Sequence, residues 1–244
     1  MTRILRDLFS TKPKRQYLLN SLIPAIFVIY FGSLAAAIQF SREAYDWRRK
    51  SISWLLYPHN DPSFHIIASL AVAVTGLLMM PFAAYIRARL RSAFMIFTDL
   101  GALILGLGAL LLILAGLIVS HPYAGKARFP RLHEALARGA AFALGMGMLM
   151  LWLSAIKTWF ASSTKGALHL RRLLIAWSLL LIPAIVVAAL RLLAYVARGS
   201  SSGLFRAIEN RSLWHLGFWE WIGSGAVFLF LLSSALFLPD RLPE

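Results

Sequence analysis

The pair His133–Glu134 follows Pro130 and brings together an imidazole and a carboxylate, two side chains that commonly move protons. A carboxylate beside a histidine can orient the ring, so we predict His133 as a general base and Glu134 as a catalytic partner. The alternative is structural: Glu134 favours the positive end of a helix and can pair with Arg138 one turn later. The zinc-protease pattern His-Glu-x-x-His is absent, because alanine occupies position 137.

Glu220, between Trp219 and Trp221, is the third predicted catalytic residue. A carboxylate near hydrocarbon is costly and usually faces the interior of a bundle or a polar cavity. From there it would orient His133 in place of Glu134. The alternative is an interfacial acid near Arg211 or Arg191.

A third group of polar residues is predicted to hold a ligand. Its members are Ser51, Ser53, His59, Asp61, His65 and His215. A serine nucleophile needs a base within hydrogen-bond reach, which spacing alone does not supply, and the alternative is a turn followed by a helix cap.

Metal and cofactor chemistry find little support in the sequence. The spacing of His59, His65, His121 and His133 matches no metal-site pattern, so no metal and no cofactor are predicted. Ligation of a haem or chlorophyll by His121 or His215 stays open as an alternative. Cysteine is absent, which excludes disulfides, thiolate metal sites and a cysteine nucleophile.

These residues lie at the ends of long apolar runs. A helix needs about 20 mostly apolar residues to cross a hydrocarbon core of ~30 Å. The runs that meet this length are Leu18–Phe40, Phe64–Ile86, Ala93–Val119, Ala135–Phe160, Leu173–Tyr195 and Phe218–Leu238. Because 59% of the residues are hydrophobic, we predict an all-α polytopic membrane protein, a six-helix bundle forming one domain over residues 1–244.

The basic residues favour lipid over nucleic acid as the partner. The net charge is +15, but lysine and arginine stand in short loops between apolar runs, where they meet anionic headgroups. The numbers of lysine and arginine residues on the two sides of the membrane are nearly equal in this topology. The Arg-Ala-Arg-Leu-Arg turn at 87–91 and the acid-free loop 161–172 favour cytoplasmic termini, and a cell (inner) membrane is expected.

Small residues predict which helices approach closely, since membrane helices associate through van der Waals contact at such positions. Gly139, Ala143 and Gly147 recur on the fourth run, and Gly101, Gly106, Gly108 and Gly116 occur on the third. These two helices are expected to pack together.

In this topology five of the six histidines and six of the ten acids gather on the outer side, and only His169 is a histidine of the inner side. Those on the outer side are His59, His65, His121, His133 and His215 with Glu43, Asp46, Asp61, Glu134, Glu209 and Glu220. We therefore expect a protein that binds or remodels a phospholipid or glycolipid headgroup at the extracytoplasmic face. The alternative is a non-catalytic scaffold or accessory subunit that contacts protein partners within the membrane. A transporter is less favoured, because no inverted repeat is evident in the run lengths.

The order of motifs resembles the Frag/DRAM/Sfk family of six-helix membrane proteins. Ser51-Ile52-Ser53 precedes a proline and Phe64, His133-Glu134 opens the fourth run with Phe142 after it, and Trp219-Glu220-Trp221 opens the sixth with Phe228-Leu229-Phe230 after it. The resemblance implies lipid-related work and a polar site of Ser53, His133, Glu134 and Glu220. Many members have an acidic-Thr/Ser-Gly turn after the serine motif, where this chain has Trp54–Asp61.

Overall fold

The computed structural model describes residues 14–58, 60, 64–90, 94–119, 129–161, 167–196 and 216–238. Within these ranges the chain forms helices and connecting turns and no strand. The helices after the first span are α5 (Ile52–Leu55), α6 (His65–Leu90), α7 (Met95–Val119), α8 (Phe129–Ala161), α9 (Ala167–Val196) and α11 (Leu216–Phe237).

The first span is one continuous helix with two wider π-helical stretches. It runs through α2 (Arg15–Tyr17), η1 (Leu18–Leu22), α3 (Ile23–Phe27), η2 (Val28–Gly32) and α4 (Ser33–Phe40). Pro24 is the second residue of α3, just past the end of η1, and has no N–H to donate to the preceding turn. A wide turn beside it is a common way for a helix to continue past such a gap.

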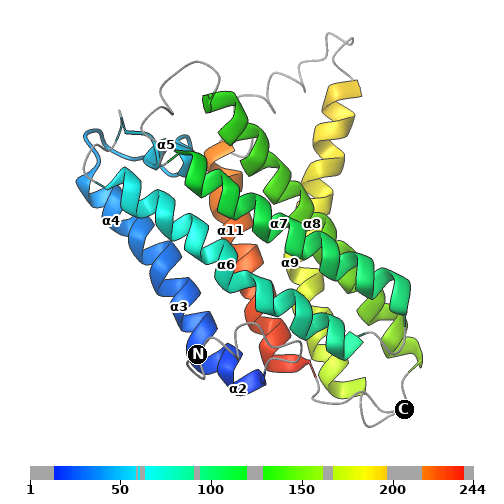
Figure 1. Cartoon of the computed structure of the whole chain (residues 1–244). Coiled ribbons are helices and arrows are strands. Elements are labelled where there is room, and N and C mark those ends of the chain that lie inside the picture. The colour runs from blue at the N-terminus through cyan, green and yellow to red at the C-terminus, as the bar shows by residue number, and fades with distance from the viewer. Residues whose placement is uncertain are drawn as a thin grey trace.

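Within the described ranges six helices are long and apolar enough to cross a membrane, which confirms the predicted all-α six-helix bundle. The spans are Arg15–Phe40, His65–Leu90, Met95–Val119, Leu132–Ala161, His169–Val186 and Gly217–Phe237. The chain is therefore an integral membrane protein. An even number of crossings brings the start of α2 and the end of α11 to the same end of the bundle (Figure 1), where the Arg15 guanidinium donates to the Leu236 carbonyl.

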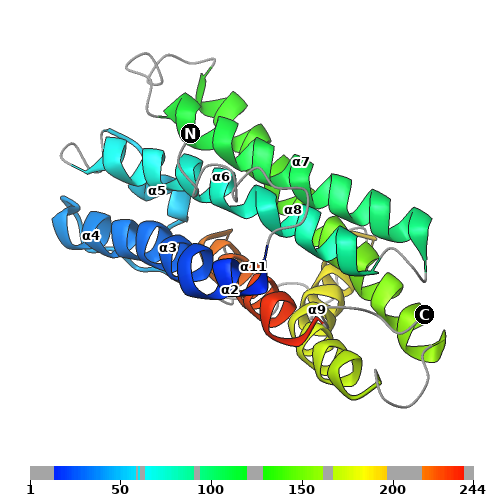
Figure 2. The same ribbon diagram turned by 60° about the horizontal axis from the view of Figure 1, so that its bottom comes forward.

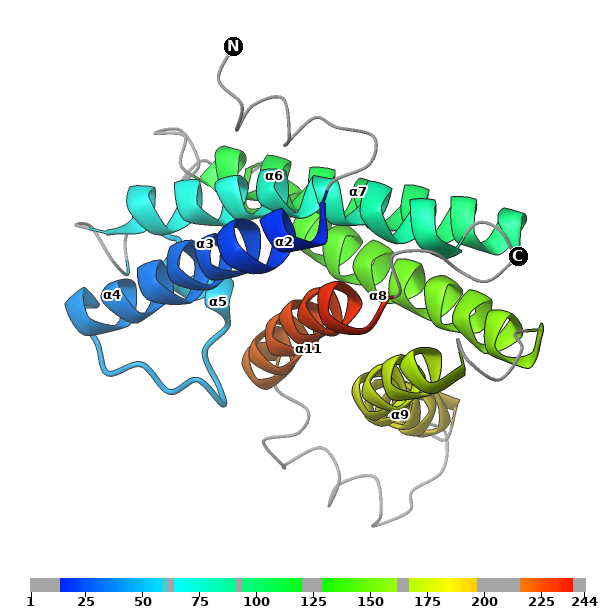
Figure 3. The same cartoon turned by 90° about the horizontal axis from the view of Figure 1, so that it is seen from below.

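The helices form two layers. Figures 2 and 3 show α6, α7 and α8 side by side in one layer, facing a second layer made of the first span, α11 and α9. In the first layer α7 lies between α6 and α8 and contacts both extensively, and in the second α11 contacts both α9 and the first span. Residues 41–58, which include α5, lie at the end where α6, α8 and α11 begin (Figure 1); we call this the α5 end.

The predicted contact of the third and fourth helices is confirmed for most of the named small residues. A Cβ on Gly147 would lie 2.8 Å from the Leu105 nitrogen and one on Gly108 would lie 2.8 Å from the Leu144 nitrogen, so α7 and α8 touch through backbone. Two of the named glycines do not take part in this contact. Gly116 packs on α6 against the Ser69 carbonyl, and a Cβ added to Gly106 would have no atom within 4 Å. Gly76 of α6 makes an equivalent approach to the Ala109 carbonyl.

Toward the end away from α5, α9 and α11 pack on each other and against the opposite layer. Trp177 of α9 stacks on Phe230 of α11 with ring centroids 4.3 Å apart, and its indole N–H donates to the Ser233 hydroxyl. Phe82 and Leu151 of the opposite layer are fully buried in the same cluster. The interlayer space is thus closed at that end.

Replacing Gly147 with alanine tests the close α7–α8 contact. The added Cβ would meet only backbone atoms at 2.8–3.0 Å, which cannot move aside locally. We expect Gly147→Ala to lower the free energy of unfolding by about 1–3 kcal/mol, measured by thermal unfolding in detergent. Gly106→Ala is the matched control and should not destabilise the protein; equal effects of both substitutions would contradict the contact.

Candidate functional site

A cavity of about 460 Å³ lies between the two layers and reaches toward the α5 end. Its lining comes from the first span, α5 and all five of the longer helices, so it is a feature of the whole bundle. Toward the α5 end the lining is polar, and it includes Ser51, Ser53, His133, Glu134 and Glu220. Farther in it is apolar, with Met79, Leu112, Met148, Leu181 and Leu231.

Helix α5 sits at the polar end because its apolar residues have neighbours to pack against. Ile52, Leu55 and Leu56 are buried in a cluster with residues of the first span, α6 and α7. Ser51 caps the short helix: its hydroxyl oxygen accepts from the Trp54 N–H at 3.1 Å. Ser51 therefore has a structural role, whereas the helix cap predicted from the sequence at Ser63 lies outside the described residues.

The Glu220 carboxylate joins α11 to α5. Its Oε2 accepts from the Ser53 N–H at 3.2 Å, and its Oε1 accepts from the Ser53 hydroxyl at 3.4 Å. None of the ion pairs among the described residues involves Glu220. A half-buried carboxylate thus lines the cavity with hydrogen-bond donors but, among the described residues, makes no ion pair within 4 Å. The charge of Arg138, which lines the same cavity, acts on it at longer range.

His133 is 2% exposed and lines the cavity from the first turns of α8. Its Nδ1 lies 3.0 Å from the Ala115 carbonyl oxygen, which can only accept, so Nδ1 donates. In the neutral ring Nε2 is then an acceptor, and it has no hydrogen-bond partner among the described residues. The ring meets Tyr57 edge-on, with centroids 6.0 Å apart.

The prediction that a carboxylate orients His133 was wrong. The Glu134 carboxylate instead accepts from Arg138 at 3.2 Å, the i,i+4 pair of the structural alternative, and Glu220 is engaged by Ser53. A main-chain carbonyl of α7 orients the ring. A carbonyl can fill this role because the buried N–H needs only an acceptor.

Three hydroxyl groups extend the polar lining inward, and sequence reasoning missed all of them. The Tyr30 and Ser224 oxygens are 2.8 Å apart, linking the first span to α11, and Thr75 of α6 is 4% exposed. The Thr75 hydroxyl has no partner among the described residues. A single hydroxyl inside a long apolar run gives no periodic signal in the sequence. Whether it lines the cavity depends on how the helix is rotated about its axis.

Tyr45 anchors the segment before α5 to α11. Its hydroxyl accepts from the Trp221 indole N–H at 2.8 Å and donates toward the carbonyls of Lys50 and Ser51. Burial raises the pKa of Tyr45 to about 12, and the negative charge of Glu220 adds to this effect. The hydroxyl therefore remains a donor at any physiological pH.

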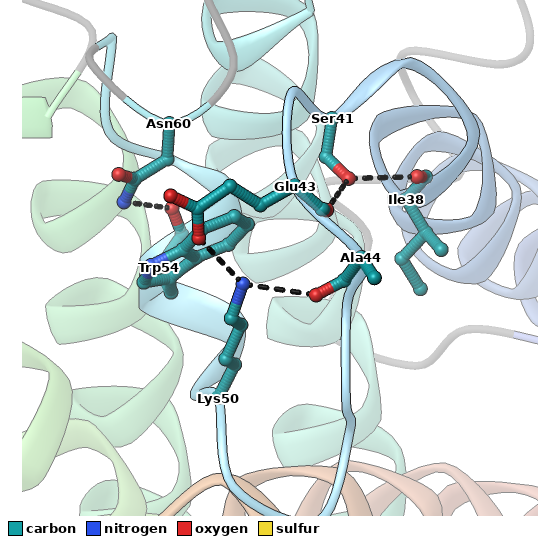
Figure 4. A network of polar contacts seen from close by, with 7 residues as sticks. All are labelled: Ile38, Ser41, Glu43, Ala44, Lys50, Trp54 and Asn60. Atoms are coloured by element: carbon teal, nitrogen blue, oxygen red, sulfur yellow. Dashed lines mark hydrogen bonds and ion pairs between the residues drawn. The ribbon is translucent and has the colours of Figure 1, made fainter.

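Lys50 connects the end of the same segment to its beginning (Figure 4). Its ammonium group donates to the Glu43 carboxylate at 3.0 Å and to the Ala44 carbonyl at 2.9 Å. It also lies 3.9 Å from the centre of the Trp54 ring. On the far side of the segment, the Asn60 side chain donates to the Trp54 carbonyl at 2.9 Å. Residues 41–58 thus form an ordered cover over the polar end of the cavity.

The structure brings five of the predicted site residues to one cavity, namely Ser51, Ser53, His133, Glu134 and Glu220. His65 begins α6 and is not among the lining residues. His59, Asp61 and His215, with His121, lie outside the described residues. Among those that are described, no three histidine, aspartate or glutamate side chains group as metal ligands would.

Comparison with protein-family profiles, with curated proteins and with solved structures gives no match. The resemblance to the Frag/DRAM/Sfk family therefore rests on the short motifs alone and stays a prediction.

Replacing Tyr45 with phenylalanine tests the anchor of residues 41–58. The change removes the donor to the Lys50 and Ser51 carbonyls and leaves the Trp221 N–H unpaired. Because a buried polar group that loses its partner costs about 1–3 kcal/mol, Tyr45→Phe should lower the thermal unfolding midpoint in detergent. Tyr57→Phe is the control, since its hydroxyl has no hydrogen bond within the described ranges; a larger effect there would refute the anchor.

Proposed function

We propose that this protein binds a membrane lipid, with the headgroup among the polar residues of the α5 end and the hydrocarbon chains in the apolar part of the cavity. The observation that carries the proposal is the gradient along a single cavity. Ser53, His133, Glu134 and Glu220 line one end, whereas methionine and leucine side chains line the other. An amphiphile has the same division between a polar and an apolar part.

The dimensions of the cavity support a lipid of one leaflet. Along α8 the lining runs from His133 to Met148, an axial rise of about 22 Å. One leaflet contributes roughly 15 Å of hydrocarbon, half of the usual core. The lining is thus long enough to run past a headgroup and along the first part of the adjoining chains. Its volume falls within the range of about 300–1,000 Å³ typical of ligand sites.

The hydrogen bonds favour binding over bond cleavage. A serine nucleophile would need His133 within hydrogen-bond reach. Ser51 instead caps α5 and Ser53 donates to Glu220. In a catalytic version, the His133 Nε2 would act as general base toward a group of the ligand, with Ser51 or Ser53 holding the headgroup. Cytoplasmic termini, which the basic turns favour, would put the α5 end at the extracytoplasmic face of the membrane.

Filling the cavity tests the proposal. Gly223 lines the cavity, and a Cβ added to it would have no atom within 4 Å. A leucine side chain at this position can therefore extend into the cavity without a clash at its Cβ. We expect Gly223→Leu to reduce severalfold the lipid that copurifies with the protein, measured by mass spectrometry of extracted lipid. The thermal unfolding midpoint should not fall.

Gly225→Leu is the matched control on the same helix. Gly225 also has no atom within 4 Å of an added Cβ, but it is not a lining residue. Two residues along a helix differ by about 200° in direction. If the two variants retain the same lipid as the wild type, the cavity is not a lipid site and a scaffold role gains support.

A further inference from the structure

We infer that the bound lipid is a zwitterionic aminophospholipid, whose primary ammonium is received by Glu220 and His133 and whose phosphate is received by Arg138. This inference rests on the proposed lipid site and specifies the chemical class of the headgroup.

The charged groups at the polar end of the cavity do not balance. They are the carboxylates of Glu134 and Glu220 and the guanidinium of Arg138, so one negative charge is in excess. Arg138 makes its ion pair with Glu134 and acts on Glu220 only at longer range, so Glu220 is the carboxylate that has no close cation among the described residues. A cationic group of the ligand would complete this site.

One buried acceptor points to a hydrogen-bond donor on that cation. The His133 Nε2 belongs to a lining residue that is 2% exposed, and it has no partner among the described residues. Leaving buried polar atoms unsatisfied is costly. A primary ammonium has three N–H donors, as in lysine, and can serve a carboxylate and an imidazole together. A trimethylammonium has none.

Arg138 supplies the complementary group for a phosphate. It lies on α8, whereas Glu220 lies on α11, and both line the same cavity. The guanidinium has five N–H donors and uses one nitrogen, Nη2, on Glu134. Arginine is well suited to phosphate because its planar fork matches the geometry of two oxygens. A headgroup carrying both charges would therefore span from α8 to α11.

The short segment 53–57 contacts both acceptors. At its start Ser53 donates to Glu220, and at its end the Tyr57 ring meets the His133 ring edge-on. Glu134 directly follows His133 on α8 and lines the same cavity as Tyr57. Residues from α5, α8 and α11 thus converge on one headgroup-sized region.

The test is a titration of the delipidated protein in detergent with phosphatidylethanolamine, phosphatidylcholine and phosphatidylglycerol of identical acyl chains, followed by native mass spectrometry. We expect the ethanolamine lipid to bind at least about tenfold more tightly than the other two, as a hydrogen bond to a charged group typically allows. Glu220→Gln should abolish this preference. The glutamine oxygen can still accept from Ser53, and an unchanged unfolding midpoint verifies the fold.

Glu43→Gln is the matched control, because Glu43 is an exposed carboxylate at the same end and does not line the cavity. It should keep the wild-type preference. If all three lipids bind equally and Gly223→Leu still prevents their binding, the headgroup assignment fails while the lipid site stands. Tighter binding of phosphatidylglycerol or phosphatidylcholine than of phosphatidylethanolamine also overturns the assignment. If no phospholipid binds in a manner sensitive to Gly223→Leu, the proposed function itself fails.

Discussion

The hydrogen bonds between the Glu220 carboxylate and Ser53 hold the polar end of this bundle together. They connect α11 to a short helix that cannot satisfy its own first N–H groups. In and near hydrocarbon each such group needs a protein partner. The carboxylate meets this need for the Ser53 N–H, and Ser51 does so for Trp54. With its first turn satisfied, α5 can bury Ile52 and Leu55 and cover the cavity.

The same arrangement explains why this carboxylate is tolerated without an ion pair among the described residues. Main-chain and hydroxyl donors stabilise its charge, and Tyr45 and Trp221 fix the surrounding segment through a further hydrogen bond. These contacts do not use every lone pair of the carboxylate. On the opposite side of the cavity the His133 ring is held by a carbonyl through Nδ1, which leaves Nε2 free of protein partners within the described residues. Structural contacts thus present two acceptors to a ligand at fixed positions.

Sequence patterns predicted the number of spans because length and hydropathy are properties of each helix alone. They also predicted that His133, Glu134 and Glu220 lie at one end of the bundle, since alternating crossings assign helix ends to sides. They did not predict the partner of His133. That partner is a main-chain carbonyl of α7, and nothing in the side-chain sequence marks which carbonyl an adjacent helix presents. Tyr30, Thr75 and Ser224 were missed for a related reason: hydropathy gives the extent of a span and not its rotation.

Glycine positions account for where the cavity lies. On the α6–α7–α8 layer, Gly76, Gly108 and Gly147 let backbones approach so closely that a Cβ would collide. That layer therefore has no room for a ligand. Gly145 and Gly223 instead face the interlayer space, and neither has an atom within 4 Å of an added Cβ. Glycine thus allows close contact where another helix packs against it, and leaves open volume where no helix does. The open volume extends inward from Glu220 and His133 as far as Leu181 and Leu231, where the stacked rings of Trp177 and Phe230 belong to the buried core.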